Sequence, residues 1–291
     1  MIDISHDDRF LLIGTMNSIE LVDVRSGRLL WSTFASGLPW MYVCFHPDGK
    51  SFLYSGRDFG IVRRPFHVQE GSDSAEPIAE VGEAETIGRA YDSTIQSIES
   101  NGKSWVVALD RTRALASTPP RFDPIYIVRM DVWPDGRPEK ARTIASGEQM
   151  TGLSLSPDGR WAASATLPAT DVRLWDAQTG KSIGLLGMPG ATLNRFAPDG
   201  RWLVVRGPKE FRLWAVGAWT RGPSWPVPSG SRAIARISFS PDGRILALPQ
   251  TTTQFQFIDT RNFTEALSLA VPLQIHDVVW SHDSRRFYLL A

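Results

Sequence analysis

Residues 156–187, SPDGRWAASATLPATDVRLWDAQTGKSIGLLG, decide the fold of this chain. They contain an Asp-Gly turn, an apolar run, a loop, an alternating run that ends in Trp175-Asp176, a second turn at Thr179-Gly180 and a short last apolar run. Short extended segments separated by Pro, Asp and Gly predict strands joined by tight turns. The stretch therefore predicts one small antiparallel sheet of four strands. Because such a sheet cannot bury both of its faces alone, we expect several copies that stack.

Copies of the turn at Ser156–Arg160 recur along the whole chain. Close copies are His46–Lys50, Ala197–Arg201 and Ser240–Arg244, and looser copies are Ser5–Arg9, Glu99–Lys103 and Ser281–Arg285. Measured between their second residues, successive copies are 41, 53, 57, 41, 43 and 41 residues apart. Four of these six spacings fall in the range of about 40–45 residues that propeller blades show, and the other two indicate insertions.

Apolar residues flank the turn in all seven copies. The residue directly before the turn is Ile4, Phe45, Ile98, Leu155, Phe196, Phe239 or Trp280, and the residue two places after it is Leu11, Phe52, Trp105, Ala162, Leu203, Leu246 or Phe287. We expect these residues to point inward from the two strands of a hairpin. The alternative is another all-β sandwich in which Asp-Gly turns recur by coincidence.

A third and a fourth strand follow most hairpins. The third strand ends at Val22-Asp23, Met130-Asp131, Trp175-Asp176, Trp214-Ala215 and Ile258-Asp259, and fourth strands are expected at 28–33, 140–144, 181–186 and 266–270. No segment of useful length has the helical period, so the predicted class is all-β.

The quoted stretch resembles a blade of the WD-repeat β-propeller family, in its bacterial type with degenerate repeats, and Phe211–Trp214 is similar to a worn copy. The resemblance is strongest in 153–187, moderate in 193–214 and 234–270, and weakest in 57–98 and 110–136. It implies a propeller, usually of seven four-stranded blades, that serves as a platform for protein interactions. The Gly-His pair that usually opens a repeat is absent, so the family's buried His–Ser/Thr–Trp network cannot form in its usual way. We therefore expect the blades to be held mainly by apolar packing between sheets.

The repeats predict one propeller domain over residues 1–291. Their approximate bounds are 1–37, 38–88, 89–149, 150–190, 191–230, 231–273 and, in part, 274–291. The seventh repeat stops after two strands, which predicts a seven-bladed ring with an incomplete last blade. The alternative is a piece of a longer array, and both leave an unpaired edge at 286–290.

The composition does not indicate binding to nucleic acid or membrane, export, or disulfide bonding. The 31 acidic and 31 basic residues balance, so nothing draws the whole chain toward nucleic acid or an anionic membrane. The first residues are acidic where an export signal would be basic, and no run approaches the ~18 apolar residues of a membrane span. Cys44 is the only cysteine, which excludes an internal disulfide. We expect a soluble, cytoplasmic protein.

No residue pattern predicts catalysis, a cofactor or a metal. The five histidines have no close His-His or His-Cys spacing. The nearest approach to a G-x-S-x-G nucleophile turn is Gly152–Ser156, which fails at its last position and lies on a predicted strand. A phosphate-binding loop is also missing. We therefore expect a protein that is not an enzyme.

The surface loops remain as candidates for partner binding. The longest predicted loop, Asp110–Pro124, carries Arg113, Arg121 and Phe122, and arginine and aromatic residues often anchor interfaces. Trp40, Arg57, Arg206 and Lys209 are expected on the same face. The alternative is an insertion without a partner. A second insertion, 64–77, is expected to be a mobile loop on the other face. Trp219 and Trp225 predict either a peptide-binding pair or packing beneath a loop.

Two functions follow from this surface. The first is a non-enzymatic scaffold that binds a protein or peptide. The second is a propeller segment of a larger protein, such as the regulatory domain of a kinase or the gating domain of an oligopeptidase-type hydrolase.

The predicted orientation of side chains has a direct test. We expect Trp175→Ala and Phe239→Ala each to lower the free energy of unfolding by about 3–5 kcal/mol, as buried aromatic residues do. Arg113→Ala should leave it nearly unchanged. Urea unfolding measures all three, and equal effects would show that the inward and outward assignments are wrong.

Overall fold

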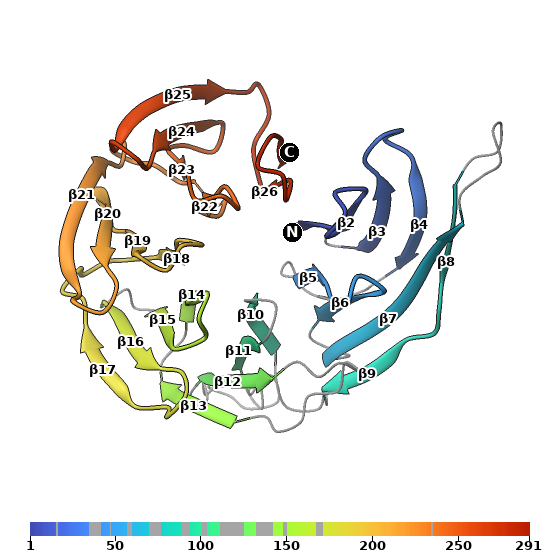
Figure 1. Ribbon diagram of the computed structural model, residues 1–291, viewed down its shortest axis with the longest axis horizontal. Helices are drawn as coiled ribbons and strands as arrows, with labels where there is room; N and C mark the ends of the chain where they lie inside the picture. The colour runs from blue at the N-terminus through green and yellow to red at the C-terminus, as the bar shows by residue number, and fades with distance from the viewer. Residues whose placement is uncertain are drawn as a thin grey trace, which may run out of the picture. The chain divides into compact units, whose positions relative to one another are not determined.

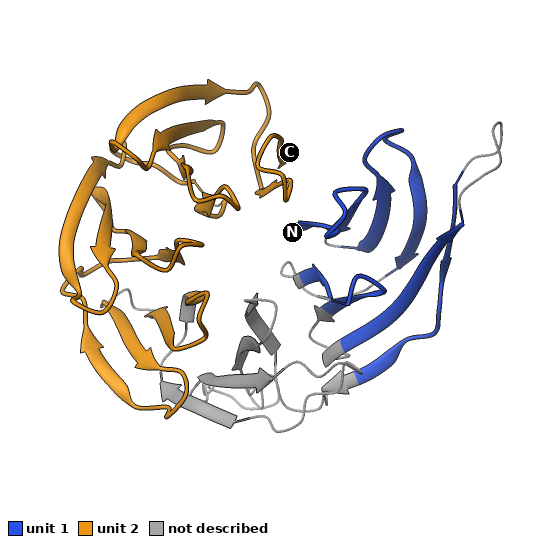
Figure 2. Ribbon diagram, viewed as in Figure 1, with its two compact units in different colours: residues 1–95, 133–137 blue, residues 96–132, 138–291 orange. Residues whose placement is uncertain are grey.

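The computed structural model describes residues 1–15, 17–34, 42–46, 48–56, 60–69, 77–88, 94–100, 104–110, 125–131, 142–147, 150–166, 171–233 and 235–291. Within these ranges every regular element is a β-strand, so the all-β prediction is confirmed. The chain divides into two compact units (Figure 2), residues 1–95 with 133–137 and residues 96–132 with 138–291.

Unit 1 contains two antiparallel sheets (Figure 1). The first has the order β1 (Ile2–Ile4), β2 (Phe10–Gly14), β3 (Ser18–Asp23) and β4 (Leu29–Phe34). The second has the order β5 (Tyr42–Phe45), β6 (Ser51–Gly56), β7 (Gly60–Gln69) and β8 (Ile78–Val81), and β9 (Glu85–Gly88) also pairs with β7.

The other sheets belong to unit 2, except for the first two residues of β10. The β10–β13 sheet contains β10 (Thr94–Ser100), β11 (Ser104–Asp110), β12 (Ile125–Asp131) and β13 (Arg142–Gly147). The β14–β17 sheet contains β14 (Met150–Leu155), β15 (Trp161–Thr166), β16 (Val172–Asp176) and β17 (Ser182–Leu185). The β18–β21 sheet contains β18 (Leu193–Phe196), β19 (Trp202–Arg206), β20 (Glu210–Ala215) and β21 (Thr220–Pro226). The β22–β25 sheet contains β22 (Ser238–Phe239), β23 (Ile245–Pro249), β24 (Gln254–Asp259) and β25 (Thr264–Ala270). The last sheet is the pair β26 (Asp277–Trp280) and β27 (Phe287–Leu290). Each of these sheets follows chain order.

The register of the strands agrees with the repeat alignment residue by residue. The apolar residues that flank the turn are direct cross-strand partners: Ile4 with Leu11, Phe45 with Phe52, Leu155 with Ala162, Phe196 with Leu203, Phe239 with Leu246 and Trp280 with Phe287. The predicted third-strand ends pair with the same set, as Trp175 does with Ala162 and Trp214 with Leu203. The sequence spacing therefore located three strands of a sheet at once.

A serine hydroxyl organises the repeated turn. Ser156 Oγ donates to Asp158 Oδ1 over 2.5 Å and accepts a hydrogen bond from Trp161 N over 2.8 Å. The same pair of bonds recurs at Ser5, Ser240 and Ser281, whose side chains are buried. Because the hydroxyl replaces water for a strand amide next to the turn, serine and aspartate are favoured at these two positions.

Side chains of the β18–β21 sheet are buried on both of its faces. Leu203, Val205 and Trp214 pack with residues of the β14–β17 sheet, whereas Val204 and Phe211 pack with residues of the β22–β25 sheet. Alternation along a strand sends neighbouring residues to opposite faces, so both contacts come from the same strands. These sheets stack in series, which excludes a two-layer sandwich for this part of the chain.

Two aromatic turn residues reach the preceding sheet. Trp219, between β20 and β21, lies with its ring 5.8 Å from Trp161 of β15, and Phe263, between β24 and β25, lies 5.8 Å from Trp202 of β19. Both have positive φ, 53° and 61°, a conformation that is unusual for bulky residues. Trp225 is buried in the core. Of the two interpretations of Trp219 and Trp225, packing is therefore the correct one.

Two expectations need correction. Residues 64–69 were predicted to be part of a loop, but they continue β7, and β8 pairs with residues 66–69; residues 70–76 lie outside the described ranges. Phe239 packs against the core but stays partly exposed, so its substitution should cost less than that of Trp175.

Apolar packing joins neighbouring sheets, and a polar contact between second and third strands adds to it within a sheet. Trp175 Nε1 donates to Ser164 Oγ over 2.9 Å, and both side chains are buried. The equivalent positions hold Arg64 and Tyr54 in the β5–β9 sheet, where Arg64 Nε donates to the Tyr54 hydroxyl over 3.2 Å. In the β18–β21 sheet, Val205 takes the place of the serine. There Trp214 Nε1 is buried and has no hydrogen-bond partner among the described residues.

We expect Ser164→Ala to lower the free energy of unfolding by about 1–3 kcal/mol, because it leaves a buried indole N–H without an acceptor. Val205→Thr should be nearly neutral, since it offers a hydroxyl near Trp214 Nε1. Val204→Thr is the matched control: its hydroxyl would be buried on the opposite face, away from the indole, at a cost of about 1–3 kcal/mol. Urea unfolding compares the three, and equal costs for the two threonine variants would contradict this account.

His46 stands where four other turns have serine. It is 4% exposed, and Asp48 N–H donates to its Nδ1 over 3.1 Å. Burial lowers the pKa of His46 below its ordinary value of 6.5, although the neighbouring Asp48 carboxylate acts in the opposite direction. The buried imidazole is therefore neutral at pH 7.

This predicts a pH-dependent loss of stability. Between pH 6.5 and the lower pKa of His46 in the folded chain, the unfolded chain binds a proton that the folded chain does not, so the free energy of unfolding falls as the pH falls, by at most about 1.4 kcal/mol per pH unit. His46→Ser, which installs the serine of the other turns, should remove this contribution. Urea unfolding of both proteins between pH 7 and pH 5 measures it, and parallel losses would disprove the role of His46.

Candidate binding surface

The structure describes two of the seven predicted partner-binding residues, Arg206 and Lys209. Trp40, Arg57, Arg113, Arg121 and Phe122 lie outside the described residues, so they stay predictions. Arg206 ends β19, and Lys209 directly precedes β20. The short connection between these strands therefore brings the two cations close in sequence, but their environments differ.

Arg206 links two neighbouring connections of unit 2. Its Nη2 donates to the Ser231 carbonyl over 3.3 Å and to Ser231 Oγ over 3.1 Å. Its guanidinium also lies over the ring of Phe211, 5.9 Å from the centroid. Burial lowers the pKa of the Arg206 guanidinium below its ordinary value. The side chain is half-buried and engaged inside its own unit, so its contacts are those of a structural residue.

Lys209 has an exposed side chain. Its backbone carbonyl accepts a hydrogen bond from Val227 N over 2.8 Å, which fixes the β19–β20 connection against the segment after β21. Such a rigid backbone with an exposed cation is the arrangement expected of a surface recognition residue. Lys209 therefore remains a candidate for partner binding.

A pocket of about 280 Å³ adjoins this connection. It is lined by three glutamines, two prolines, one glutamate and one serine: Pro226, Pro228, Gln250, Gln254, Gln256, Glu265 and Ser268. Ser231 Oγ donates to the carbonyl of Gln250, so the Arg206 contact with Ser231 ends at the pocket wall.

The amides of the pocket form a chain of hydrogen bonds. Gln250 Nε2 donates to Gln256 Oε1 over 2.8 Å, and Gln256 Nε2 donates to Glu265 Oε2 over 2.6 Å. Gln250 is buried, whereas Gln256 is half-buried and Glu265 is exposed. Amide groups can pair with the backbone of a peptide, because each offers a donor and an acceptor. The pocket can therefore take part in binding an extended polypeptide.

Sequence reasoning missed these glutamines. Gln250 directly follows β23, whereas Gln254 and Gln256 belong to β24, and no spacing in the sequence marks the three as a group. Their alternation with Phe255 and Phe257, both buried, was the one available signal: it puts Gln254 and Gln256 together on one face of β24.

Within the described ranges, no three histidine, cysteine, aspartate or glutamate side chains gather closely enough to hold a metal ion. In the same part of the chain, no helix has the length and hydrophobicity to cross a bilayer.

We expect substitution of Arg206 and of Lys209 to change the free energy of unfolding by different amounts. Arg206→Ala should lower the free energy of unfolding by about 1–3 kcal/mol, because it removes the bonds to Ser231 and the contact with Phe211. Lys209→Ala should change it by less than about 0.5 kcal/mol, as is usual for exposed residues. Thermal and urea unfolding measure both. If Arg206→Ala left the free energy of unfolding unchanged, the structural role of Arg206 would be contradicted and the residue would again be a candidate for partner binding.

No protein-family model matches the chain. Aladin from Arabidopsis thaliana, a WD-repeat protein, is 31% identical to it over 105 residues. The alignment covers 35% of this chain and 23% of Aladin, so the chain matches less than a quarter of the length of that relative. This partial similarity and the four-stranded sheets both agree with WD-repeat blades.

Proposed function

We propose that this chain is a seven-bladed β-propeller of the WD-repeat type with an incomplete last blade, and that it serves as a non-enzymatic scaffold for protein interactions. The observation that carries the proposal is the burial of the β18–β21 sheet on both faces. A sheet that is covered in this way offers partners only its loops and edges. Loops on a rigid β-scaffold are common sites of recognition.

The similarity to Aladin supports the same role in a coarse form, because WD-repeat proteins typically bind other proteins. Lys209 and the amide-lined pocket, on adjoining segments, add a place where a polypeptide could be held. A peptide or protein is therefore the proposed partner, without a cofactor and without nucleic acid or membrane.

Affinity capture from the source cells tests this function. We expect the tagged wild-type chain to capture a defined partner, and Lys209→Glu, or the triple change of Arg113, Arg121 and Phe122 to alanine, to reduce its recovery at least about tenfold. Lys181→Glu, an exposed substitution at the β16–β17 turn, is the matched control and should retain the partner. Recovery that is unchanged in both test variants would remove this surface, and the failure to capture any partner would argue against a scaffold.

A further inference from the structure

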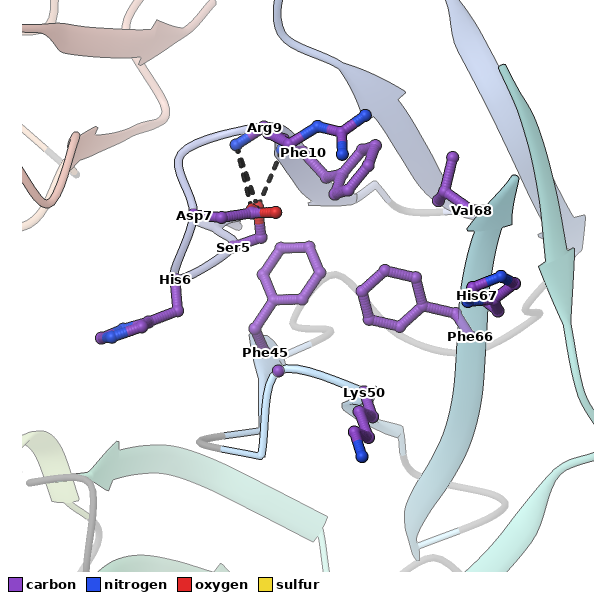
Figure 3. Close-up of a pocket in the computed structure, with 11 residues that line it drawn as sticks. Ser5, His6, Asp7, Arg9, Phe10, Phe45, Lys50, Phe66, His67 and Val68 are labelled. Atoms are coloured by element: carbon purple, nitrogen blue, oxygen red, sulfur yellow. Dashed lines mark hydrogen bonds between the residues drawn. The ribbon is translucent and has the colours of Figure 1, made fainter. Parts of the chain in front are cut away.

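A groove in unit 1 combines an aromatic floor with a sheet edge and cationic rims. It lies between the β1–β2 turn, the β5–β6 turn and β7, and its volume is about 370 Å³ (Figure 3). The ring of Phe66 is 6.0 Å from that of Phe10 and 5.7 Å from that of Phe45. Phe45 and Phe66 are only half-buried, so their rings remain accessible to a ligand. The volume is within the range of about 300–1,000 Å³ that ligand pockets show.

At the groove, strand β7 extends beyond the end of β6, the strand that pairs with its inner side. The pairing of β6 with β7 ends at Ser51 and Pro65, and Phe66 N then donates to the Lys50 carbonyl over 2.9 Å. On the other side, β8 pairs with residues 66–69 of β7. Residues 67–69 therefore have a strand partner on one side only, within the described part of the chain.

The backbone of Val68 faces the groove. Phe66 N–H points toward the inner side of β7, and Gly82 N donates to the Pro65 carbonyl on the outer side over 2.8 Å. Because successive residues alternate in direction, the N–H and C=O of Val68 point to the inner side, as those of Phe66 do. Val68 also lines the groove. One donor and one acceptor thus stand ready to pair with an added strand.

The charge of the groove favours an acidic ligand. Arg9 and Lys50 lie on opposite sides of the rings (Figure 3), and Asp7 is the one acidic residue among those that line the groove. Asp7 Oδ1 accepts hydrogen bonds from Ser5 Oγ over 2.6 Å and from Arg9 N over 3.2 Å, so its carboxylate is turned to its own turn. Lys50 and His67 are exposed. Cations at both rims complement a segment with acidic residues at both ends.

We propose that this groove binds an extended acidic peptide segment, which adds to β7 at Val68 and places an apolar side chain on the rings of Phe45 and Phe66. Main-chain bonds to a sheet edge give affinity in this mode, and the pocket and rim charges select the side chains. The inference rests on the interaction role proposed above, for which it names a second surface and the chemistry of the partner.

Fluorescence anisotropy with a labelled pentapeptide, a central phenylalanine flanked by two glutamates on each side, tests the proposal. Wild-type protein should bind it in a salt-dependent manner, and Arg9→Glu or Lys50→Glu should weaken binding at least about tenfold. Val68→Pro removes the inward N–H without affecting the β7–β8 bonds and should weaken binding to a similar degree. Val68→Ala is the matched control and should retain most of the affinity.

Peptides with lysines in place of the glutamates, or glycine in place of the phenylalanine, should bind at least about tenfold more weakly. Circular dichroism and thermal unfolding check that each variant is folded. Should Val68→Pro fail to fold, hydrogen exchange of the Val68 amide in the wild type decides, because added peptide should slow it. An absence of binding, equal binding by the charge-reversal variants, or an unprotected Val68 amide would overturn the proposal. Equally tight binding of an oligouridylate or of phosphatidylserine vesicles would also overturn it.

The outcome is separable from that of the scaffold role. A cellular partner that is captured equally by wild type and by Lys50→Glu, with no binding of the pentapeptide, would leave the scaffold in place and reject the groove. Specific binding of the pentapeptide without any captured partner would support the groove and argue against the scaffold.

Discussion

Burial of both faces of the β18–β21 and β22–β25 sheets is the constraint on which this structure depends. Along β19, Leu203, Val204 and Val205 are fully buried, although neighbouring residues in a strand point to opposite faces. Burying such a side chain contributes about 1.5–3 kcal/mol, and this contribution is lost wherever a sheet lacks a neighbour. A four-stranded sheet of this composition therefore requires a companion on each side, and repetition along the chain supplies it.

The sequence could predict the hairpins because the turn encodes its own geometry. Serine, aspartate and glycine each answer a separate requirement of the turn: a hydroxyl for the strand amide, a carboxylate for the turn amides, and a positive φ, which is 69° at Gly159 and 72° at Gly200. The looser copies satisfy the last requirement with Asp8 and Ser284, at 58° and 61°. Since the aspartate and the residue with positive φ recur together in all six described turns, the register followed from the spacing alone.

Strand β7 could not be predicted, because its second half lacks these markers. Residues 63–69, RRPFHVQ, contain a proline and several polar side chains, which are typical of a loop. Pro65 is tolerated because its missing N–H faces the outer side, in the gap between β8 and β9. The groove was missed because its rings lie far apart in the sequence: Phe10 belongs to β2, Phe45 to β5 and Phe66 to β7. Arg206 shows the converse case, since its partner Ser231 lies 25 residues away and nothing local marks the contact.

Trp219 and Phe263 each contact the sheet that precedes their own sheet in the chain. Each occupies a backbone position where glycine would cost nothing, and strain of about 1–3 kcal/mol is offset in part by the ring contact that it makes with the sheet before it. The β14–β17 sheet has Gly180 at the equivalent position, φ 74°, and has no ring to place there. The shared core joins successive sheets, and the contact that a turn residue adds to it consequently differs from one pair of sheets to the next. Repeated sheets of this kind can thus differ in how a turn contacts the preceding sheet while the cross-strand register of their hairpins stays the same.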